Sequence, residues 1–241
     1  MGNARNGRVW MGWLAVLVMA TLAAPCLAAP EGGTGGGSFW GTIMAGAGWV
    51  GFLIMAVSVA GVALVIYNYM NVSQPKLVPE ALLVEVNNLF EEEQYEEALQ
   101  LCAANESFLA KVIASGLNSM GGGYDAMVSS MNDANVEQTV KQQHLIAWLN
   151  LTSAIAPMLG LFGTVHGMII AFGIIKTQSA PKPSDLALGI EQALITTWLG
   201  LIVAIPMVCF YFVFRNRVER ISILVGNTVG ELTGRFRPQA S

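Results

Sequence analysis

Residues 186–214 read LALGIEQALITTWLGLIVAIPMVCFYFVF. This run of 29 residues contains a single Asp, Glu, Lys or Arg, which is Glu191. A helix needs roughly 20 apolar residues to cross the hydrocarbon core of a bilayer, which is about 30 Å thick. The run therefore predicts a membrane-spanning helix.

Two further runs share this property. No Asp, Glu, Lys or Arg lies between Glu31 and Lys76, and none lies in residues 145–175. Across the chain 54% of residues are hydrophobic and 12% are charged, with a mean hydropathy of +0.55. A soluble domain carries about twice that charged fraction. We expect an all-α membrane protein with three transmembrane helices, over 45–70, 145–175 and 186–214.

The segment between the first two spans is polar and acidic. Lys76–Gln143 contains eleven acidic residues and three lysines, a net charge of −8, which argues against a nucleic acid as its partner. Apolar residues recur in it at helical spacing, so a helical domain is predicted. The last helix of this domain, beginning near Asp125, should continue without a break through His144 into the second span. The second and third helices are thus expected to be long and continuous.

The N-terminus has the pattern of a secretory signal. Arg5 and Arg8 precede an apolar core of about 13 residues, Trp10–Leu22, and small residues follow up to Ala28. The core is short for a span, so cleavage after Ala28 is predicted. An uncleaved signal anchor is the alternative.

Arginines set the orientation. Arg215, Arg217 and Arg220 follow the third span directly, and such clusters mark the cytoplasmic side. The helical domain and the C-terminus are therefore expected in the cytoplasm and the mature N-terminus in the periplasm of a bacterial inner membrane. The predicted organisation is a signal peptide (1–28), a Gly-rich periplasmic N-terminus (29–44), a first span (45–70), a cytoplasmic helical domain (71–144), a second span (145–175), a periplasmic loop (176–185), a third span (186–214) and a cytoplasmic tail (215–241).

The sequence carries no enzyme motif. There is no Ser/His/Asp set on the spans, no HExxH, no CxxC and no phosphate-binding Gly-rich loop after a strand. The cysteines Cys26, Cys102 and Cys209 fall in three different compartments, which argues against a disulfide or a metal site. We expect no enzymatic activity, no cofactor and no metal.

Polar residues inside the spans are the candidate functional groups. A charged carboxylate such as Glu191 costs at least about 2–3 kcal/mol within the bilayer, and such residues mark ion pathways. The hydroxyls of Thr164, Thr196 and Thr197 come next. Thr164 and Thr196 lie roughly 17 Å below the outer surface at a rise of about 1.5 Å per residue, so two helices bring hydroxyls to one level. They serve either an ion pathway or ordinary hydrogen bonds to helix carbonyls. His166, about one turn nearer the surface, is a candidate relay group or a satisfied polar residue.

Small residues predict close contact between the second and third helices. Their four-residue spacing lets helix backbones approach in lipid. The candidate packing residues are Gly160, Gly163, Gly167, Ala193 and Gly200, and helix kinks are expected at Pro157 and Pro206. On the third helix the small residues lie opposite Glu191, Leu194 and Trp198. Three helices do not bury both faces, which suggests a homo-oligomer with a central lumen.

Two motifs resemble a known family. Residues 156–168, APMLGLFGTVHGM, and residues 189–197, GIEQALITT, followed by 200–206, GLIVAIP, resemble the signatures of the MotA/TolQ/ExbB proton channel family. Three spans resemble its ExbB/TolQ branch, whereas flagellar stator subunits of the family have four. The predicted signal peptide departs from the simplest members.

The resemblance implies a mechanism and partners. It implies a pentamer enclosing the single helices of two copies of an ExbD/TolR-type partner, whose aspartate binds the proton. The work would reach an outer-membrane process through a TonB- or TolA-like transducer. Thr164 and Thr196 match the hydroxyl positions of the family and Glu191 matches its carboxylate. Many relatives carry Trp where this chain has His166, so a relay role is not inherited.

Alternatives remain at this stage. Thr196 lies about 140° from Glu191 on an ideal helix, so the two cannot face one narrow lumen, and Glu191 then belongs at a subunit interface. The other functions considered are a flagellar-type stator subunit, a structural membrane scaffold without ion flux and, more remotely, an intramembrane protease. The threonines suit either H⁺ or Na⁺.

Overall fold

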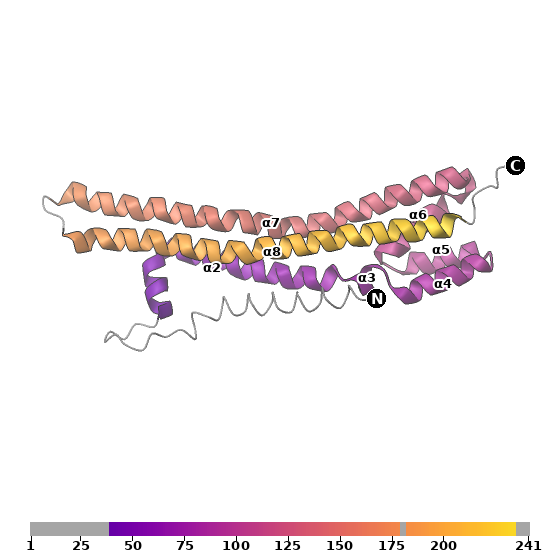
Figure 1. Ribbon diagram of the computed structural model, residues 1–241, viewed down its shortest axis with the longest axis horizontal. Coiled ribbons are helices and arrows are strands. Elements are labelled where there is room, and N and C mark those ends of the chain that lie inside the picture. Colours follow the sequence, from indigo (N-terminus) through magenta and orange to yellow (C-terminus); the bar gives the residue numbers. More distant parts are fainter. Residues whose placement is uncertain (1–38, 179–181, 235–241) are drawn as a thin grey trace. The chain divides into compact units, whose positions relative to one another are not determined.

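The computed structural model describes residues 39–178 and 182–234, and these residues contain helices and no strand. The predicted signal peptide (1–28), most of the predicted periplasmic N-terminus (29–44), part of the loop and the last residues of the tail lie outside this range. The elements in chain order are α2 (Phe39–Asn71), α3 (Gln74–Leu77), α4 (Glu80–Glu91), α5 (Tyr95–Ala104), α6 (Phe108–Asn118), the short 3₁₀ helix η1 (Met120–Gly122), α7 (Tyr124–Thr177) and α8 (Pro183–Gly234) (Figure 1).

Three of the described helices are long and apolar enough to cross a membrane. They lie over Gly48–Asn71, Tyr124–Thr177 and Leu186–Gly234. The predicted all-α membrane fold with three transmembrane helices is confirmed, and so are the long second and third helices. In particular, α7 runs unbroken through His144. The protein is a multi-pass membrane protein.

The described chain divides into two compact units. The first unit comprises residues 39–62, 151–178 and 182–208, and the second comprises residues 63–150 and 209–234. The helices α2, α7 and α8 therefore contribute a segment to each unit. Each unit has its own cluster of buried apolar residues.

The second unit is a helical domain built around one apolar core. The amphipathic helices α4, α5 and α6 turn their apolar residues inward, as their helical spacing predicts. Part of α7 and one stripe of α8 complete this core. Its fully or nearly fully buried members are Leu82, Val86, Phe90, Ala98, Cys102, Phe108, Leu109, Val112, Ile113, Met131, Ile221 and Val225.

Local signals fix the start of α6, the most buried helix of this unit. Ser107 caps the helix, because its Oγ accepts a hydrogen bond of 3.3 Å from the Ala110 N–H. The Asn105 side chain in turn accepts a bond of 2.9 Å from the Ser107 N–H. Cys102 lies in the neighbouring core, where burial raises the pKa of its thiol to about 11. This thiol is protonated at neutral pH, which fits an inert packing residue.

The first unit is a three-helix arrangement of α2, α7 and α8. Val50 and Ile54 of α2 are buried against Ala156 of α7 and against Val203 and Ala204 of α8. The start of α2 is kinked at Gly48, whose φ of 56° and ψ of −155° interrupt the helical geometry. A residue with a side chain rarely adopts this φ, so glycine is required there. The kink lies one residue before Trp49.

The helices α7 and α8 contact each other backbone to backbone in the first unit. We call this contact the small-residue seam, formed by Gly160, Gly163 and Gly167 of α7 with Gly189, Ala193 and Gly200 of α8. A Cβ atom placed on Gly200 would lie 2.7 Å from the carbonyl oxygen of Ala156. One placed on Gly189 would lie 2.8 Å from the carbonyl oxygen of Gly167. Since residue numbers rise along α7 as they fall along α8, the two helices are antiparallel.

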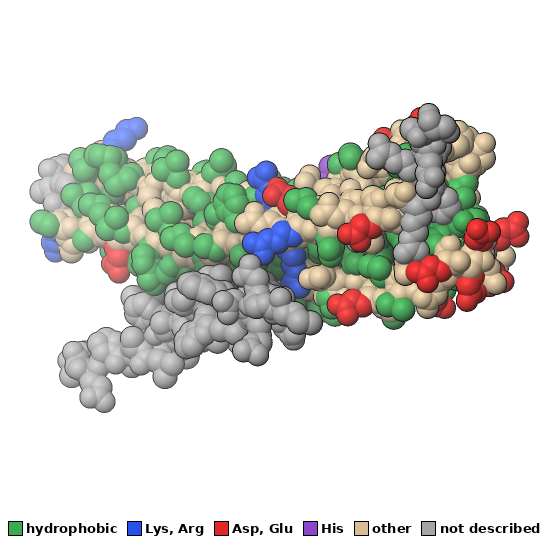
Figure 2. Space-filling model, turned by 45° about the vertical axis from the view of Figure 1, so that its right-hand side comes forward, with side chains coloured by type: hydrophobic (Ala, Val, Ile, Leu, Met, Phe, Trp, Pro, Cys, Tyr) green, Lys and Arg blue, Asp and Glu red, His purple; other side chains and the backbone are tan. Residues whose placement is uncertain are grey.

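The outer surface of the first unit is apolar. Large hydrophobic side chains are exposed along all three helices, among them Phe52, Leu161, Phe172, Leu188 and Ile205. Hydrophobic side chains cover much of the visible helix surface in Figure 2, whereas acidic side chains gather over the helical domain. A surface of this kind suits lipid or neighbouring spanning helices. Both α7 and α8 continue through Pro157 and Pro206, and the predicted kinks there stay predictions.

The seam predicts that substitution by alanine affects the stability of the protein very differently at two glycines of α7. A methyl group on Gly167 would meet the Gly189 carbonyl oxygen at 2.5 Å, whereas one on Gly173 would meet nothing within 4 Å. We expect Gly167→Ala to lower the free energy of unfolding by about 1–3 kcal/mol because a backbone oxygen cannot move aside. Gly173→Ala should leave it unchanged or slightly raised. Unfolding by SDS titration in mixed micelles measures both, and equal effects would contradict the seam.

Candidate functional site

The site is built on the seam, where the hydroxyl of Thr196 is buried. Thr196 is 0% exposed and faces Gly163, whose missing side chain leaves room for it. Its Oγ1 donates to the carbonyl oxygens of its own helix, to Gln192 at 3.1 Å and to Ala193 at 3.0 Å. The hydroxyl is thus satisfied within α8 and sits directly against α7.

Thr197 links the two helices by a hydrogen bond. Its Oγ1 donates to the carbonyl oxygen of Gly160 on α7 at 3.3 Å and to that of Ala193 on α8 at 3.1 Å. Gly160 favours this approach, because a Cβ there would lie 3.1 Å from the Cα of Thr197, and one of the two backbones would have to shift by a few tenths of an ångström. The sequence offered Thr196 and Thr197 together as candidate pathway residues, and the structure distinguishes them by this interhelical bond.

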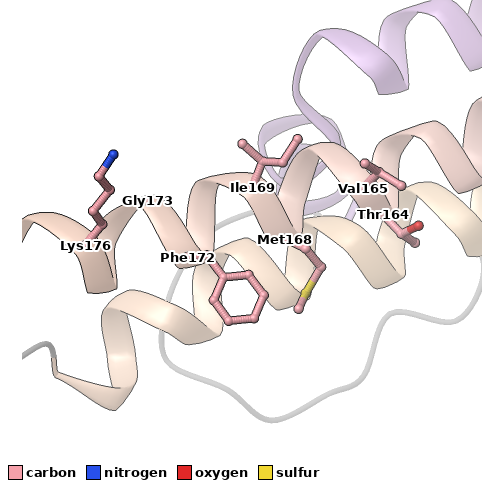
Figure 3. A pocket seen from close by; sticks show the side chains of 7 residues that line it. All are labelled: Thr164, Val165, Met168, Ile169, Phe172, Gly173 and Lys176. Carbon is pink, nitrogen blue, oxygen red and sulfur yellow. The ribbon is translucent and has the colours of Figure 1, made fainter.

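Thr164 lies one residue beyond Gly163, on a more open surface of α7. It is half-buried, and its Oγ1 donates to the Leu161 carbonyl oxygen at 2.6 Å. It forms one end of a groove of about 520 Å³, which we call the Thr164 groove (Figure 3). The lining residues all belong to α7 and are Thr164, Val165, Met168, Ile169, Phe172, Gly173 and Lys176.

The chemistry of the groove follows from how Thr164 is bonded. Its hydroxyl hydrogen is used by the helix backbone, so the oxygen presents its lone pairs as acceptors. Lys176 is a cation at the far end of the lining, and the residues between them are apolar or glycine. Such a surface is apolar, with one hydroxyl acceptor and one cation at opposite ends of the lining. To stabilise an ionised acid, Thr164 would have to rotate its hydroxyl and donate.

Glu191 lies on the face of α8 opposite the seam. It is exposed together with Leu194 (66%) and Trp198 (46%), whereas Ala193 and Thr196 on the other face are buried. These exposures separate a buried face of α8, with Ala193 and Thr196, from the exposed face that carries Glu191. The structure therefore brings Thr196 and Thr197 together in the seam and leaves Glu191 on a separate surface.

Trp49 and His166 form a pair that the sequence did not predict. The indole Nε1–H of Trp49 donates to Nε2 of His166 at 3.3 Å, and the two rings meet edge to face with centroids 5.7 Å apart. Trp49 also contacts Phe162, with centroids 5.6 Å apart. In this arrangement Nε2 of His166 is the acceptor of the indole N–H. That fits the satisfied-polar alternative for His166, whereas a relay role requires this bond to open.

Metal ligation has no support within the part of the chain that the structure describes. No group of three or more His, Cys, Asp or Glu residues lies close enough there to hold an ion. The candidate pathway residues are instead spread along α7 and α8. This arrangement is typical of an ion pathway or of hydrogen bonding between helices.

Comparison with known proteins identifies the family. The family model described as "MotA/TolQ/ExbB proton channel family" matches residues 104–225, about half of the chain. The chain belongs to the MotA/TolQ/ExbB proton channel family. The match includes the whole seam, the Thr164 groove and Glu191, so every candidate pathway residue lies within it.

Similar proteins place this member in the ExbB/TolQ branch. It is 33% identical to the Tol-Pal system protein TolQ of Haemophilus influenzae over 111 residues, 46% of this chain and 49% of the relative. It is 36% identical to the biopolymer transport protein ExbB of Salmonella typhimurium over 86 residues, 35% of each chain. It is 28% identical to a putative ExbB homolog of Methanothermobacter thermautotrophicus over 196 residues, 76% of this chain and 66% of the relative.

The family match has clear limits along the chain. The chain spans about half the length of the TolQ relative and about a third of the ExbB relative that it matches. Trp49 and the rest of α2 lie before the matched residues. The bond between Trp49 and His166 thus joins a helix outside the family match to one inside it. In the sequence, the feature related to this bond is the glycine followed by tryptophan at the start of the first span. This feature does not predict that His166 is the partner of Trp49.

Proposed function

We propose that this protein is a proton channel subunit of the ExbB/TolQ type. With an ExbD/TolR-type single-span partner it converts the proton motive force into mechanical work for outer-membrane transport or envelope maintenance. It acts in the bacterial inner membrane, with the mature N-terminus in the periplasm and the helical domain and C-terminus in the cytoplasm. The arginines after the third apolar run support this orientation.

The Thr164 groove is the observation that carries the proposal. It combines an apolar surface with one hydroxyl at mid-span, on the helix that holds the first family motif. A partner helix seated on it would bring a protonated aspartate to Thr164. An acid in so apolar a place is tolerated when it is neutral or when hydroxyls solvate its charged form. Proton release and uptake at that acid would then depend on Thr164.

The other pathway residues act around this position. Thr196 and Thr197 lie in the seam next to Gly163 and Gly160, and rotation of their hydroxyls would supply further donors. Glu191 is assigned a place at a subunit interface, because its face of α8 is exposed and carries large apolar side chains. A homo-oligomer, proposed as a pentamer, would cover this face. A TonB- or TolA-like transducer would carry the work to the outer membrane.

Replacing Thr164 tests the proposal directly. We expect Thr164→Ala to reduce gradient-driven proton flux by about tenfold or more, since a hydrogen bond to a charged group is worth roughly 1.5–3 kcal/mol. Thr177→Ala is the matched control, because the Thr177 hydroxyl makes the same kind of bond to its own helix, at 3.1 Å to the Gly173 carbonyl oxygen, and Thr177 is not among the residues that line the groove. Flux is measured in liposomes that contain the partner.

Two outcomes of that experiment contradict the proposal. One is normal flux in Thr164→Ala. The other is an equal loss of flux in Thr177→Ala, which would indicate a general effect on the helix. Assembly of each variant with the partner is checked first by size-exclusion chromatography, so that a loss of flux is not a loss of the complex.

Glu191 gives a second prediction. We expect Glu191→Gln to uncouple the gradient from work at unchanged assembly, because the amide can neither bind nor release a proton. Glu191→Asp keeps the carboxyl group and should restore a measurable part of the flux. If Glu191→Gln carries the wild-type flux, the carboxyl group has only a structural role.

A structural scaffold without ion flux is the second candidate function. It is favoured by the hydroxyl bonds of Thr164, Thr196 and Thr197, each of which ends on a backbone carbonyl. Under this alternative the threonines only join helices. A complex with its partner that stays tight to protons under an imposed gradient would select the scaffold.

A further inference from the structure

A second pocket lies in the second unit, between α7 and α8. Its volume is about 380 Å³, within the range of ligand sites. We call it the boundary pocket. It is lined by Val140, Gln143, His144, Ile146, Ala147, Tyr211 and Arg215.

The pocket straddles the ends of two apolar runs. On α7 the uncharged run begins at Leu145, directly after His144. On α8 the apolar run ends at Phe214, directly before Arg215. Both helices therefore pass from hydrocarbon to water within the lining of this pocket. In a membrane this level is occupied by lipid headgroups.

The lining is mixed in chemistry. Val140, Ile146 and Ala147 supply apolar groups, and the other four residues supply polar groups. Each of these four can donate a hydrogen bond: the guanidinium of Arg215, the ring of His144, the amide of Gln143 and the hydroxyl of Tyr211. None of the seven lining residues is acidic.

Arg215 keeps donors for a ligand. Its Nε is engaged by Glu219 at 3.2 Å, in an ion pair whose side chains are 49% and 46% exposed. An ion pair so open to water holds its partners weakly. A guanidinium has five N–H donors; Glu219 engages the one on Nε, Tyr211 is a further hydrogen-bond partner of the guanidinium, and other N–H groups remain for a ligand. Arg217 and Arg220 follow on α8 and add positive charge at the same membrane level.

We propose that the boundary pocket binds an anionic glycerophospholipid, with the phosphate on Arg215 and His144 and the glycerol and acyl ends against Ala147, on the hydrocarbon side of His144. A phosphate on a diacylglycerol matches both halves of the lining, since it is anionic, rich in acceptors and attached to an apolar body. Basic pockets between spanning helices at the cytoplasmic side bind such headgroups. This inference requires only that the chain lies in a membrane. It does not depend on whether the protein conducts protons.

Lipid retention tests the proposal with a matched pair of arginines. The full-length protein is reconstituted in equal parts of phosphatidylglycerol and phosphatidylcholine, extracted in mild detergent, and its bound lipids are counted by native mass spectrometry. We expect wild type to retain phosphatidylglycerol over phosphatidylcholine, and Arg215→Gln to retain about tenfold less of it. Arg220→Gln removes the same charge from the same cluster outside the pocket and should retain the wild-type amount.

Three results of that experiment would overturn the proposal. They are full retention of phosphatidylglycerol in Arg215→Gln, an equal loss in Arg220→Gln, and equal retention of the two lipids by wild type. The second of these would show attraction to surface charge in general. Arg215→Lys, which keeps the charge and loses the fork of donors, should fall between wild type and Arg215→Gln.

A photocrosslinker can show whether a lipid or a second copy of the chain occupies the boundary pocket, and it removes no charge from the protein. Benzoylphenylalanine is placed at Val140, a lining residue with 43% exposure. We expect an adduct with the mass of phosphatidylglycerol after irradiation in the same membranes. An adduct with a second copy of the chain, at the expense of the lipid adduct, would assign the pocket to a subunit interface and reject the lipid.

Discussion

The backbone contact between α7 and α8 is the constraint on which the first unit depends. At Gly167 and Gly200 the opposing backbone lies so close that even a methyl group would collide with a carbonyl oxygen. In a membrane, where helices gain little from excluding water, such close approach is the main source of packing energy. The same contact places Thr196 against Gly163 and lets Thr197 bond to Gly160.

Because the seam occupies one face of α7 and one face of α8, the other faces of these two helices remain exposed. The Thr164 groove on α7 and the Glu191 face of α8 point away from the seam, and both carry large exposed apolar side chains. A single chain leaves these surfaces uncovered, with a hydroxyl on one and a carboxyl on the other. This is the physical reason to propose an assembly with a partner helix, in which a proton crosses where α7 and α8 present polar groups in an apolar setting.

The sequence predicts much of this. The uncharged runs predict three spans because length and polarity alone decide them, and the four-residue spacing of glycines predicts which faces of α7 and α8 meet. The bond between Trp49 and His166 was not predictable, because 117 positions separate the two residues and the Gly48 kink that sets Trp49 leaves no periodic signal. The different roles of Thr196 and Thr197 also required coordinates, since on an ideal helix both lie within about 60° of the direction opposite Glu191.

The central claim is that α7 and α8 stay packed as one fixed pair while protons pass. In the second unit the Oγ1 of Thr139 and the Oγ of Ser222 lie 2.9 Å apart, so cysteines there can join the two helices. Proton flux through the Thr139→Cys/Ser222→Cys variant, with the three natural cysteines replaced by serine and the partner present, is measured before and after oxidation. The account predicts a disulfide within one chain and equal flux in both states. Flux that stops on oxidation and returns on reduction would show that the pair must open, and would contradict it.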